Sequence, residues 1–259
     1  MYNKQTLSTI LLHFLLISGM TITLSASCKK DKSNNKVVIS ATGDITAKLN
    51  EFRQLLGATL NTKPDAVGGR REINWDNFPD SLIGKPIPPD FFNPVGDDAI
   101  ASRQRGLVYE AVGAFMVSQT NFLEVNSAAA SEFAAFSGNK TFSNTSIDLW
   151  EVNPKKPGTL TDGTIQGFGI VFSDVDNARS TSIEYFNEEK SLGKFFVPPH
   201  TSTSSISFLG VYFKDEKVTK VRVKHDGLLI SGEKDISQGG PHDLVILDDF
   251  LYDEPVAKQ

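Results

Sequence analysis

Cysteine and histidine are scarce in this sequence. Its 259 residues include one cysteine and four histidines, and His13 lies in the apolar N-terminal stretch. A single cysteine cannot form an internal disulfide, which excludes a disulfide framework within the chain. The other histidines, His200, His225 and His242, are isolated along the chain. This spacing argues against a transition-metal site and against a histidine-based catalytic triad.

Sequence signatures of common enzyme classes are also missing. There is no Gly-x-Ser-x-Gly, no His-Glu-x-x-His and no glycine-rich phosphate-binding loop. A glycosidase needs only a pair of carboxylates, and no spacing among the 31 acidic residues identifies one. The net charge of −5, without a basic patch, argues against nucleic acid as a partner.

The N-terminus has the three parts of a secretory signal: Lys4, an apolar stretch over residues 10–24, and small residues before Cys28. It resembles a Bacteroidetes-type lipoprotein signal, although Ser25 stands where leucine normally lies. The resemblance implies a signal peptide over residues 1–27, acylation of Cys28, and a lipoprotein of the outer membrane, on its outer face as one option. The alternatives are a retained transmembrane helix, for which the stretch is short, and a secreted protein with a free cysteine.

Beyond the leader, the chain divides into a tether and one domain. Residues 28–37 are polar and rich in lysine, which predicts a solvated tether. Residues 38–259 suffice for a single domain, whose content of phenylalanine, glycine and proline favours strands and turns. Apolar residues at helical spacing predict one helix over residues 45–56, begun by Asp44 and ended by Gly57.

For the rest of the domain, the sequence predicts a long loop followed by strands. Turn-forming residues fill positions 61–98, where Trp75, Phe78, Phe91 and Phe92 would anchor an ordered loop. Strands are expected over residues 113–118, 166–172, 182–186, 193–197, 205–213, 218–224 and 243–252. The sequence therefore predicts a mainly β protein, an antiparallel and jelly-roll-like β-sandwich with one short N-terminal helix. The irregular pattern around Gly210 predicts a bulge or bend.

Several segments occur in an order that is typical of one protein family. They are Gly69–Asp76 (GRREINWD), Phe91-Phe92-Asn93, Arg105-Gly106, Gly167–Asp176 (GFGIVFSDVD), Ser207–Val211 (SFLGV) and Asp248–Tyr252 (DDFLY). The set resembles a family of uncharacterised secreted bacterial proteins, some of which carry C-terminal PEP-CTERM sorting tails. The resemblance covers residues 45–255 and implies one domain without implying an activity. No hydrophobic tail follows Pro255, so we expect anchoring through Cys28.

Acidic residues gather at three places that could offer oxygen ligands to calcium. The last strand also resembles the closing strand of jelly-roll carbohydrate-binding modules, where an Asp-Asp pair contributes to a structural calcium site. An extended chain would put Asp174 and Asp176 on the same side, whereas a regular strand would point Asp248 and Asp249 to opposite sides. The alternative is turn chemistry, which favours aspartate without an ion. The expected calcium ligands are Asp76, Asp174, Asp176 and Asp249.

Two further groups carry chemical expectations. Arg70, Arg71 and Glu72 beside Trp75 could stack on and hydrogen-bond a sugar, or could form an internal salt-bridge network that holds the long loop. Ser81 lies in an Asp-Ser-Leu run, a pattern that Bacteroidetes O-glycosylate in exported proteins.

Catalytic motifs are absent and an aromatic-rich loop is present. Together these features favour a non-catalytic binding or adhesion module on the cell envelope, with polysaccharide or an envelope protein as partner. The alternatives are a carbohydrate-active hydrolase with an unrecognised carboxylate pair and a structural component of the envelope.

Overall fold

The computed structural model describes residues 35–110, 115–201 and 204–259. Cys28, the leader and most of the expected tether lie outside these ranges. The tether was expected to reach residue 37, but strand β1 already begins at Lys36. Its main chain pairs with a neighbouring strand, which needs no apolar side chain. No helix in the described ranges combines the length and apolar character needed to cross a bilayer.

The described chain is mainly β. One sheet contains β1 (Lys36–Thr42), β2 (Arg70–Ile73), β4 (Phe115–Ser118), β5 (Thr141–Asn144), β8 (Gly167–Ser173), β11 (Ile206–Phe213) and β13 (Ile246–Asp253). The second contains β3 (Leu107–Glu110), β6 (Leu149–Pro154), β9 (Ser182–Asn187), β10 (Lys190–Phe196) and β12 (Lys220–Lys224). The smaller elements are the β7 (Gly163–Thr164) and β14 (Val256–Ala257) pair, helix α1 (Thr46–Leu56) and the 3-10 turns η2 (Asp80–Leu82), η3 (Ala101–Arg103) and η4 (Ile236–Gln238).

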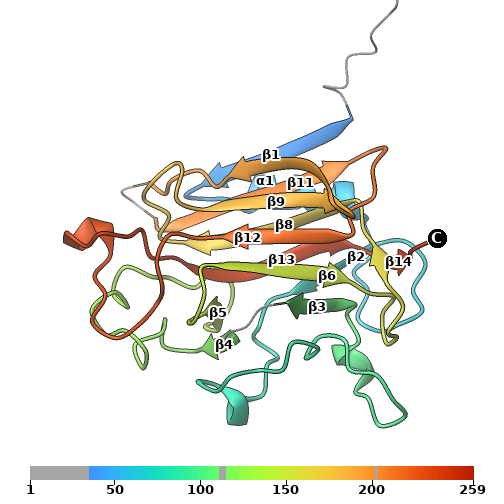
Figure 1. Ribbon diagram of the computed structural model, residues 1–259, viewed down its shortest axis with the longest axis horizontal. Coiled ribbons are helices and arrows are strands. Elements are labelled where there is room, and N and C mark those ends of the chain that lie inside the picture. The colour runs from blue at the N-terminus through green and yellow to red at the C-terminus, as the bar shows by residue number, and fades with distance from the viewer. Residues whose placement is uncertain (1–34, 111–114, 202–203) are drawn as a thin grey trace, which may run out of the picture. The chain divides into compact units, whose positions relative to one another are not determined.

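The strand order confirms the jelly-roll-like β-sandwich (Figure 1). The first sheet runs β1-β11-β8-β13-β5-β4 and the second runs β10-β9-β12-β6-β3, with antiparallel pairing throughout. From β5 onward, the first strand of the sandwich therefore pairs with the last, which is the arrangement of a double Greek key. Of the remaining strands, β1, β4 and β3 extend the edges of the two sheets, β2 pairs with β13, and β7 and β14 pair with each other.

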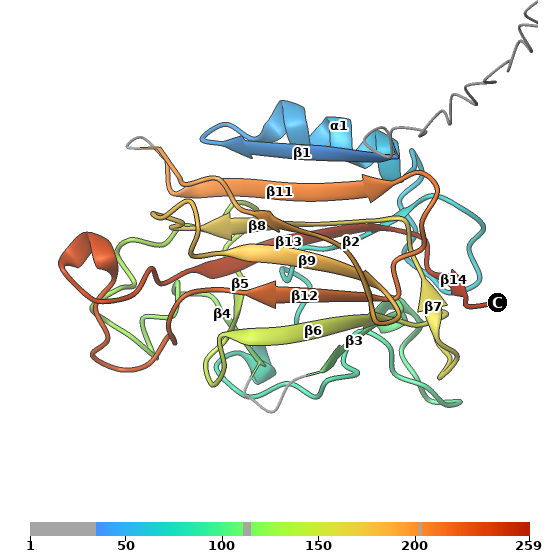
Figure 2. The ribbon, with the colours of Figure 1, turned by 45° about the horizontal axis from the view of Figure 1, so that its top comes forward.

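Helix α1 covers the outer face of the first sheet (Figure 2). Leu49, Phe52 and Leu56 are buried, and the Asp44 side chain accepts a hydrogen bond from the Thr46 N–H, 3.0 Å away, near the helix start. The predicted helix is thus confirmed. Because α1 lies on one face and the second sheet on the other, β8, β11 and β13 are buried on both faces.

Gly210 forms no bulge, contrary to the prediction. It pairs in regular register with Ile39 on one side and with Gly169 on the other. The apolar pattern was irregular because both faces of β11 are apolar: Phe208 packs under α1 and Leu209 enters the core between the sheets. Glycine is required at this position because a Cβ atom on Gly210 would lie 2.8 Å from the ring of Phe52.

The predicted long loop is ordered, and its aromatic anchors are buried or half-buried. Trp75 stacks on Phe142 with ring centroids 4.2 Å apart, and Phe78 contacts Phe91 at 4.8 Å. The sequence reading missed β2 beside this loop. This strand pairs with β13 over only four residues, and its charged sequence carries no apolar alternation.

Replacing Gly210 with alanine should destabilise the fold by about 1–3 kcal/mol, because the added methyl group overpacks the contact with Phe52. Chemical denaturation would measure this loss. In the Phe52→Leu background the same substitution should cost clearly less. An equal cost in both backgrounds would contradict the packing explanation.

Candidate functional site

Acidic side chains and one histidine converge where three loops meet at one end of the sandwich. Asp174 and Asp176 follow β8, His200 follows β10, and Asp235 and Asp243 precede β13. Since β8 and β13 are antiparallel neighbours, the end of one lies beside the beginning of the other. The jelly-roll order thus brings together residues that are far apart in the sequence.

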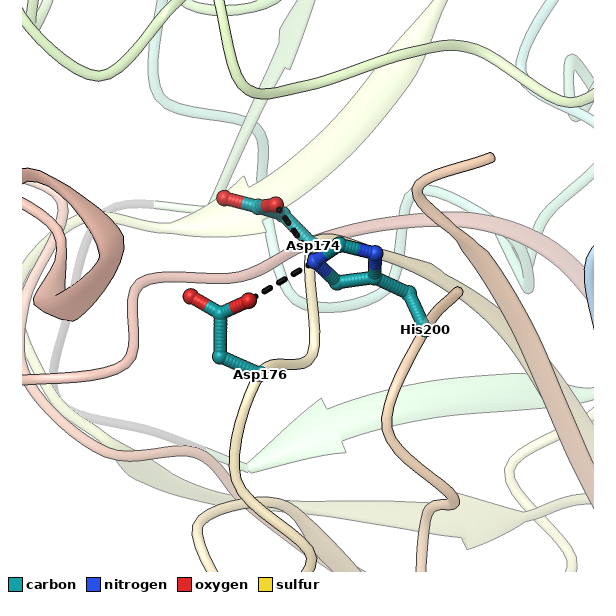
Figure 3. A group of neighbouring side chains, drawn as sticks. All are labelled: Asp174, Asp176 and His200. Atoms are coloured by element: carbon teal, nitrogen blue, oxygen red, sulfur yellow. Dashed lines mark hydrogen bonds and ion pairs between the residues drawn. The ribbon is translucent and has the colours of Figure 1, made fainter. Parts of the chain in front are cut away.

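His200 lies between the two aspartates that follow β8 (Figure 3). Its Nε2 atom is 2.7 Å from Oδ1 of Asp176 and 3.5 Å from Oδ1 of Asp174. The other ring nitrogen, Nδ1, is 2.7 Å from the carbonyl oxygen of Thr201. The backbone N–H of His200 donates to the carbonyl of Val175 at 2.7 Å. These contacts fix both the position and the ring orientation of His200.

Asp176 also belongs to a second group, with Asp235 and Asp243. One carboxylate oxygen from each lies within 4.8 Å of the others. Asp243 accepts hydrogen bonds from the backbone N–H groups of Asp176 and Asn177 and from the Ser180 hydroxyl. Asp243 therefore holds the loop after β8 in place.

Burial raises the pKa values of three carboxyl groups in this cluster. Burial, together with the nearby Asp235 and Asp176, raises the pKa of Asp174 to about 8. Burial and the contact with Asp235 raise the pKa of Asp176 to about 6. Burial also raises the pKa of Asp243. Although burial disfavours charge on His200, the Thr201 carbonyl and the two aspartates raise the pKa of its imidazole.

The expected calcium ligands do not all meet here. The structure brings Asp174 and Asp176 together, although through a turn and not through an extended chain, since Asp174 has a left-handed backbone with φ of 70°. The Asp76 carboxylate instead accepts the backbone N–H of Asn139, and Asp249 lies beside Ser137. The sequence reading missed Asp235, Asp243 and the contact of His200, because nothing local links these positions.

The condition for Asp248 and Asp249 to point to opposite sides, a regular strand, is not met in β13. The register shifts between Leu247 and Phe250, and this irregularity lets the Ser137 hydroxyl contact both carboxyl groups, at 3.4 Å and 2.7 Å. Asp248 also accepts the N–H groups of Phe136 and Ser137. Burial and the adjacent Asp249 raise the pKa of Asp248 to about 8. The pair thus joins the 136–137 segment to the closing strand.

The Asp248→Asn variant should flatten the pH dependence of folding stability. The folded pKa of Asp248 lies above the ordinary value, so its stabilising effect is complete below about pH 4 and is lost as pH rises towards 8. Denaturation of wild type and variant at pH 5, 7 and 9 measures the difference in slope. Identical slopes would contradict a raised pKa at Asp248.

The Arg70, Arg71 and Glu72 cluster is an internal network. Arg71 is fully buried and forms a bidentate ion pair with Glu254, with both contacts at 2.7 Å. Glu72 accepts hydrogen bonds from Arg53 and Arg70. Although burial of Glu72 favours the neutral acid, these arginines lower its pKa. The expected alternative, a network that holds the long loop, is what the structure contains.

Trp75 is not the exposed platform that the sugar-binding interpretation of this cluster would require. It is 1% exposed, and its indole nitrogen donates to the carbonyl oxygen of Asp248 at 2.8 Å. Because its ring stacks on Phe142, it belongs to the core between the sheets.

The buried ion pair predicts a large and specific stability effect. Arg71→Met should destabilise the fold by about 3–5 kcal/mol, because Glu254 is left as a buried charge without its partner. The double variant Arg71→Met/Glu254→Leu should lose less than the sum of the two single variants. Lys48→Met, which removes the exposed pair with Glu51, serves as the control and should cost under about 1 kcal/mol. Additive losses in the double variant would contradict the coupling.

Next to β2 lies a cavity of about 400 Å³ that combines aromatic rings with arginines. Phe78, Phe91 and Phe92 form its apolar wall. The Arg103 guanidinium lies 4.4 Å from the ring centre of Phe91. Arg105 donates to the backbone carbonyls of Ser102 and Glu72, at 2.7 Å and 2.9 Å, and burial lowers its pKa.

Positive charge exceeds negative charge around this cavity. Its one lining carboxylate, Glu72, is already paired with Arg53 and Arg70. Within the described part of the chain, no carboxylate lies within ion-pair distance of Arg103 or Arg105. The side-chain amides of Asn74 and Asn77 line the same cavity and make no hydrogen bond to described residues. The cavity therefore offers cationic and amide donors beside an apolar wall.

Comparison with protein-family models, with curated proteins and with solved structures found no match. The resemblance to a family of secreted bacterial proteins therefore stays a prediction, as do acylation of Cys28 and glycosylation of Ser81. Ser81 lies in η2 with its side chain exposed.

Proposed function

We propose that this chain is a lipid-anchored binding module of the cell envelope that takes an acidic saccharide in the cavity beside β2. The observation that carries the proposal is the pair of arginines, Arg103 and Arg105, which face this cavity without a carboxylate partner among the described residues. A planar guanidinium matches the geometry of a carboxylate and can bind it through two hydrogen bonds.

The rest of the cavity suits a sugar ring. Aromatic faces pack against the apolar face of a pyranose, and the free amides of Asn74 and Asn77 provide hydrogen-bond donors and acceptors. A volume of about 400 Å³ falls within the range of small-ligand pockets. An acidic sugar unit would therefore place its ring against Phe92, the half-buried ring of the wall, and its carboxylate on the arginines.

The same lining supports binding over hydrolysis. Glycosidases use two carboxyl groups on either side of the scissile bond, and one must be protonated to act as the acid. Glu72 is the one carboxyl group in this lining, and its arginine partners lower its pKa. This favours the binding module over the hydrolase alternative at this cavity.

Binding of oligogalacturonate to the full chain, measured by calorimetry beside a neutral cello-oligosaccharide, tests the proposal. We expect the acidic ligand alone to bind, and Arg103→Gln to weaken it by about tenfold or more because a charge-assisted contact is lost. Arg179→Gln is the matched control, since Arg179 also lies over a phenylalanine ring, that of Phe196, outside the cavity lining.

Two outcomes would overturn the proposal. One is equal binding of the neutral and acidic ligands. The other is the absence of saccharide binding in a chain that is folded by circular dichroism, which would favour a structural role in the envelope.

A further inference from the structure

Two carboxylate oxygens in the acidic cluster are buried and lack hydrogen-bond partners among the described residues. Asp174 is 2% exposed, and its Oδ2 atom makes no hydrogen bond to them. The Oδ2 atom of Asp176 is also buried and without such a partner, although the side chain as a whole is half-buried. A buried polar atom without a partner costs free energy, and an ionised one costs more. These two atoms therefore need either protons or a cation that the chain itself does not supply.

Positive charge is scarce around the cluster. Asp174, Asp176, Asp235 and Asp243 have no lysine or arginine of the described ranges within ion-pair distance. The one partner that can carry a positive charge there is the imidazole of His200. Buried carboxylates need a compensating positive charge when they are ionised, and a small divalent cation would supply it.

His200 has the orientation of a metal ligand. Its Nδ1–H donates to the Thr201 carbonyl, so Nε2 faces Asp174 and Asp176 and offers its lone pair to an ion once the imidazole is neutral. Metal-bound histidines characteristically donate their second ring N–H to a carbonyl or carboxylate in this way. This contact is independent of the unpartnered oxygens and lies beside the same two carboxyl groups.

We propose that Asp174, Asp176 and His200 bind a divalent metal ion of the zinc class. Calcium takes oxygen ligands, whereas an imidazole beside two carboxylates matches zinc chemistry. The assignment departs from two expectations drawn from the sequence, a calcium site and the absence of a transition-metal site. Three protein ligands leave a further coordination position for water.

Asp243 acts as a positioning residue for this site. By accepting the N–H groups of Asp176 and Asn177, it fixes the loop that carries two of the ligands. Asp235 lies in contact with Asp176 and caps η4 by accepting the N–H of Ser237 at 2.6 Å. A bound ion would thus connect the loops that follow β8 and β10, with the segment before β13 as their support.

Calorimetric titration of the metal-stripped full chain with zinc chloride, and separately with calcium chloride, tests the site. We expect about one zinc ion per chain, and zinc affinity at least about tenfold lower in Asp174→Asn and in His200→Gln. Asp226→Asn is the matched control: Asp226 accepts the N–H of Asp243 but belongs to neither ligand group. Its zinc affinity should equal that of wild type.

Thermal melting separates ligation from a merely structural role. Asp174→Asn should lose the rise in melting temperature that zinc produces in the wild type, because that rise requires the ion to bind the folded chain. Absence of zinc binding, or zinc binding retained in both ligand variants, would overturn the proposal. Calcium binding that persists unchanged in His200→Gln would also overturn it, since His200 would then not be a ligand.

Discussion

Burial of the central strands of the first sheet on both faces is the constraint on which the rest of the structure depends. Helix α1 covers one face and the second sheet covers the other, so β8, β11 and β13 expose almost no side chain. Gly169 and Gly210 face each other in adjacent strands and leave space for Phe52. Because these central strands are tightly held, the loops at their ends are held as well, and the acidic cluster is built on those loops.

The sequence predicted the elements whose signal is local. The helical spacing of Leu49, Phe52 and Leu56, and the alternation of Val221 and Val223 in β12, are visible without a structure. The pairing of β2 is not visible in the sequence. Arg70, Arg71 and Glu72 form a strand only because they pair with β13 and make ion pairs with Glu254 and Arg53. Bulge positions were misjudged for the same reason: regularity at Gly210 and irregularity at Asp248 are set by neighbouring strands.

The candidate sites follow the same division. Asp174 and Asp176 could be paired from their spacing, but His200, Asp235 and Asp243 join them only through the jelly-roll order. Trp75 attracted attention as an aromatic residue among charges, yet it belongs to the core, while Arg103 and Arg105 line the neighbouring cavity. At both sites, charged side chains without an oppositely charged lysine, arginine or carboxylate partner indicate where a bound ligand would stabilise the fold.

The two sites differ in the sign of their charge and in the residue types that form them. Under the two proposals, the cavity beside β2 would offer arginines to an anion, whereas the acidic cluster would offer carboxylates and an imidazole to a cation. The most direct measurement for the central claim, that the jelly-roll loops assemble a metal site, is anomalous X-ray scattering at the zinc edge from crystals of the full chain grown with zinc. The account predicts an anomalous peak bounded by Asp174, Asp176 and His200. A peak elsewhere, with the His200 imidazole still hydrogen-bonded to Asp176, would contradict it.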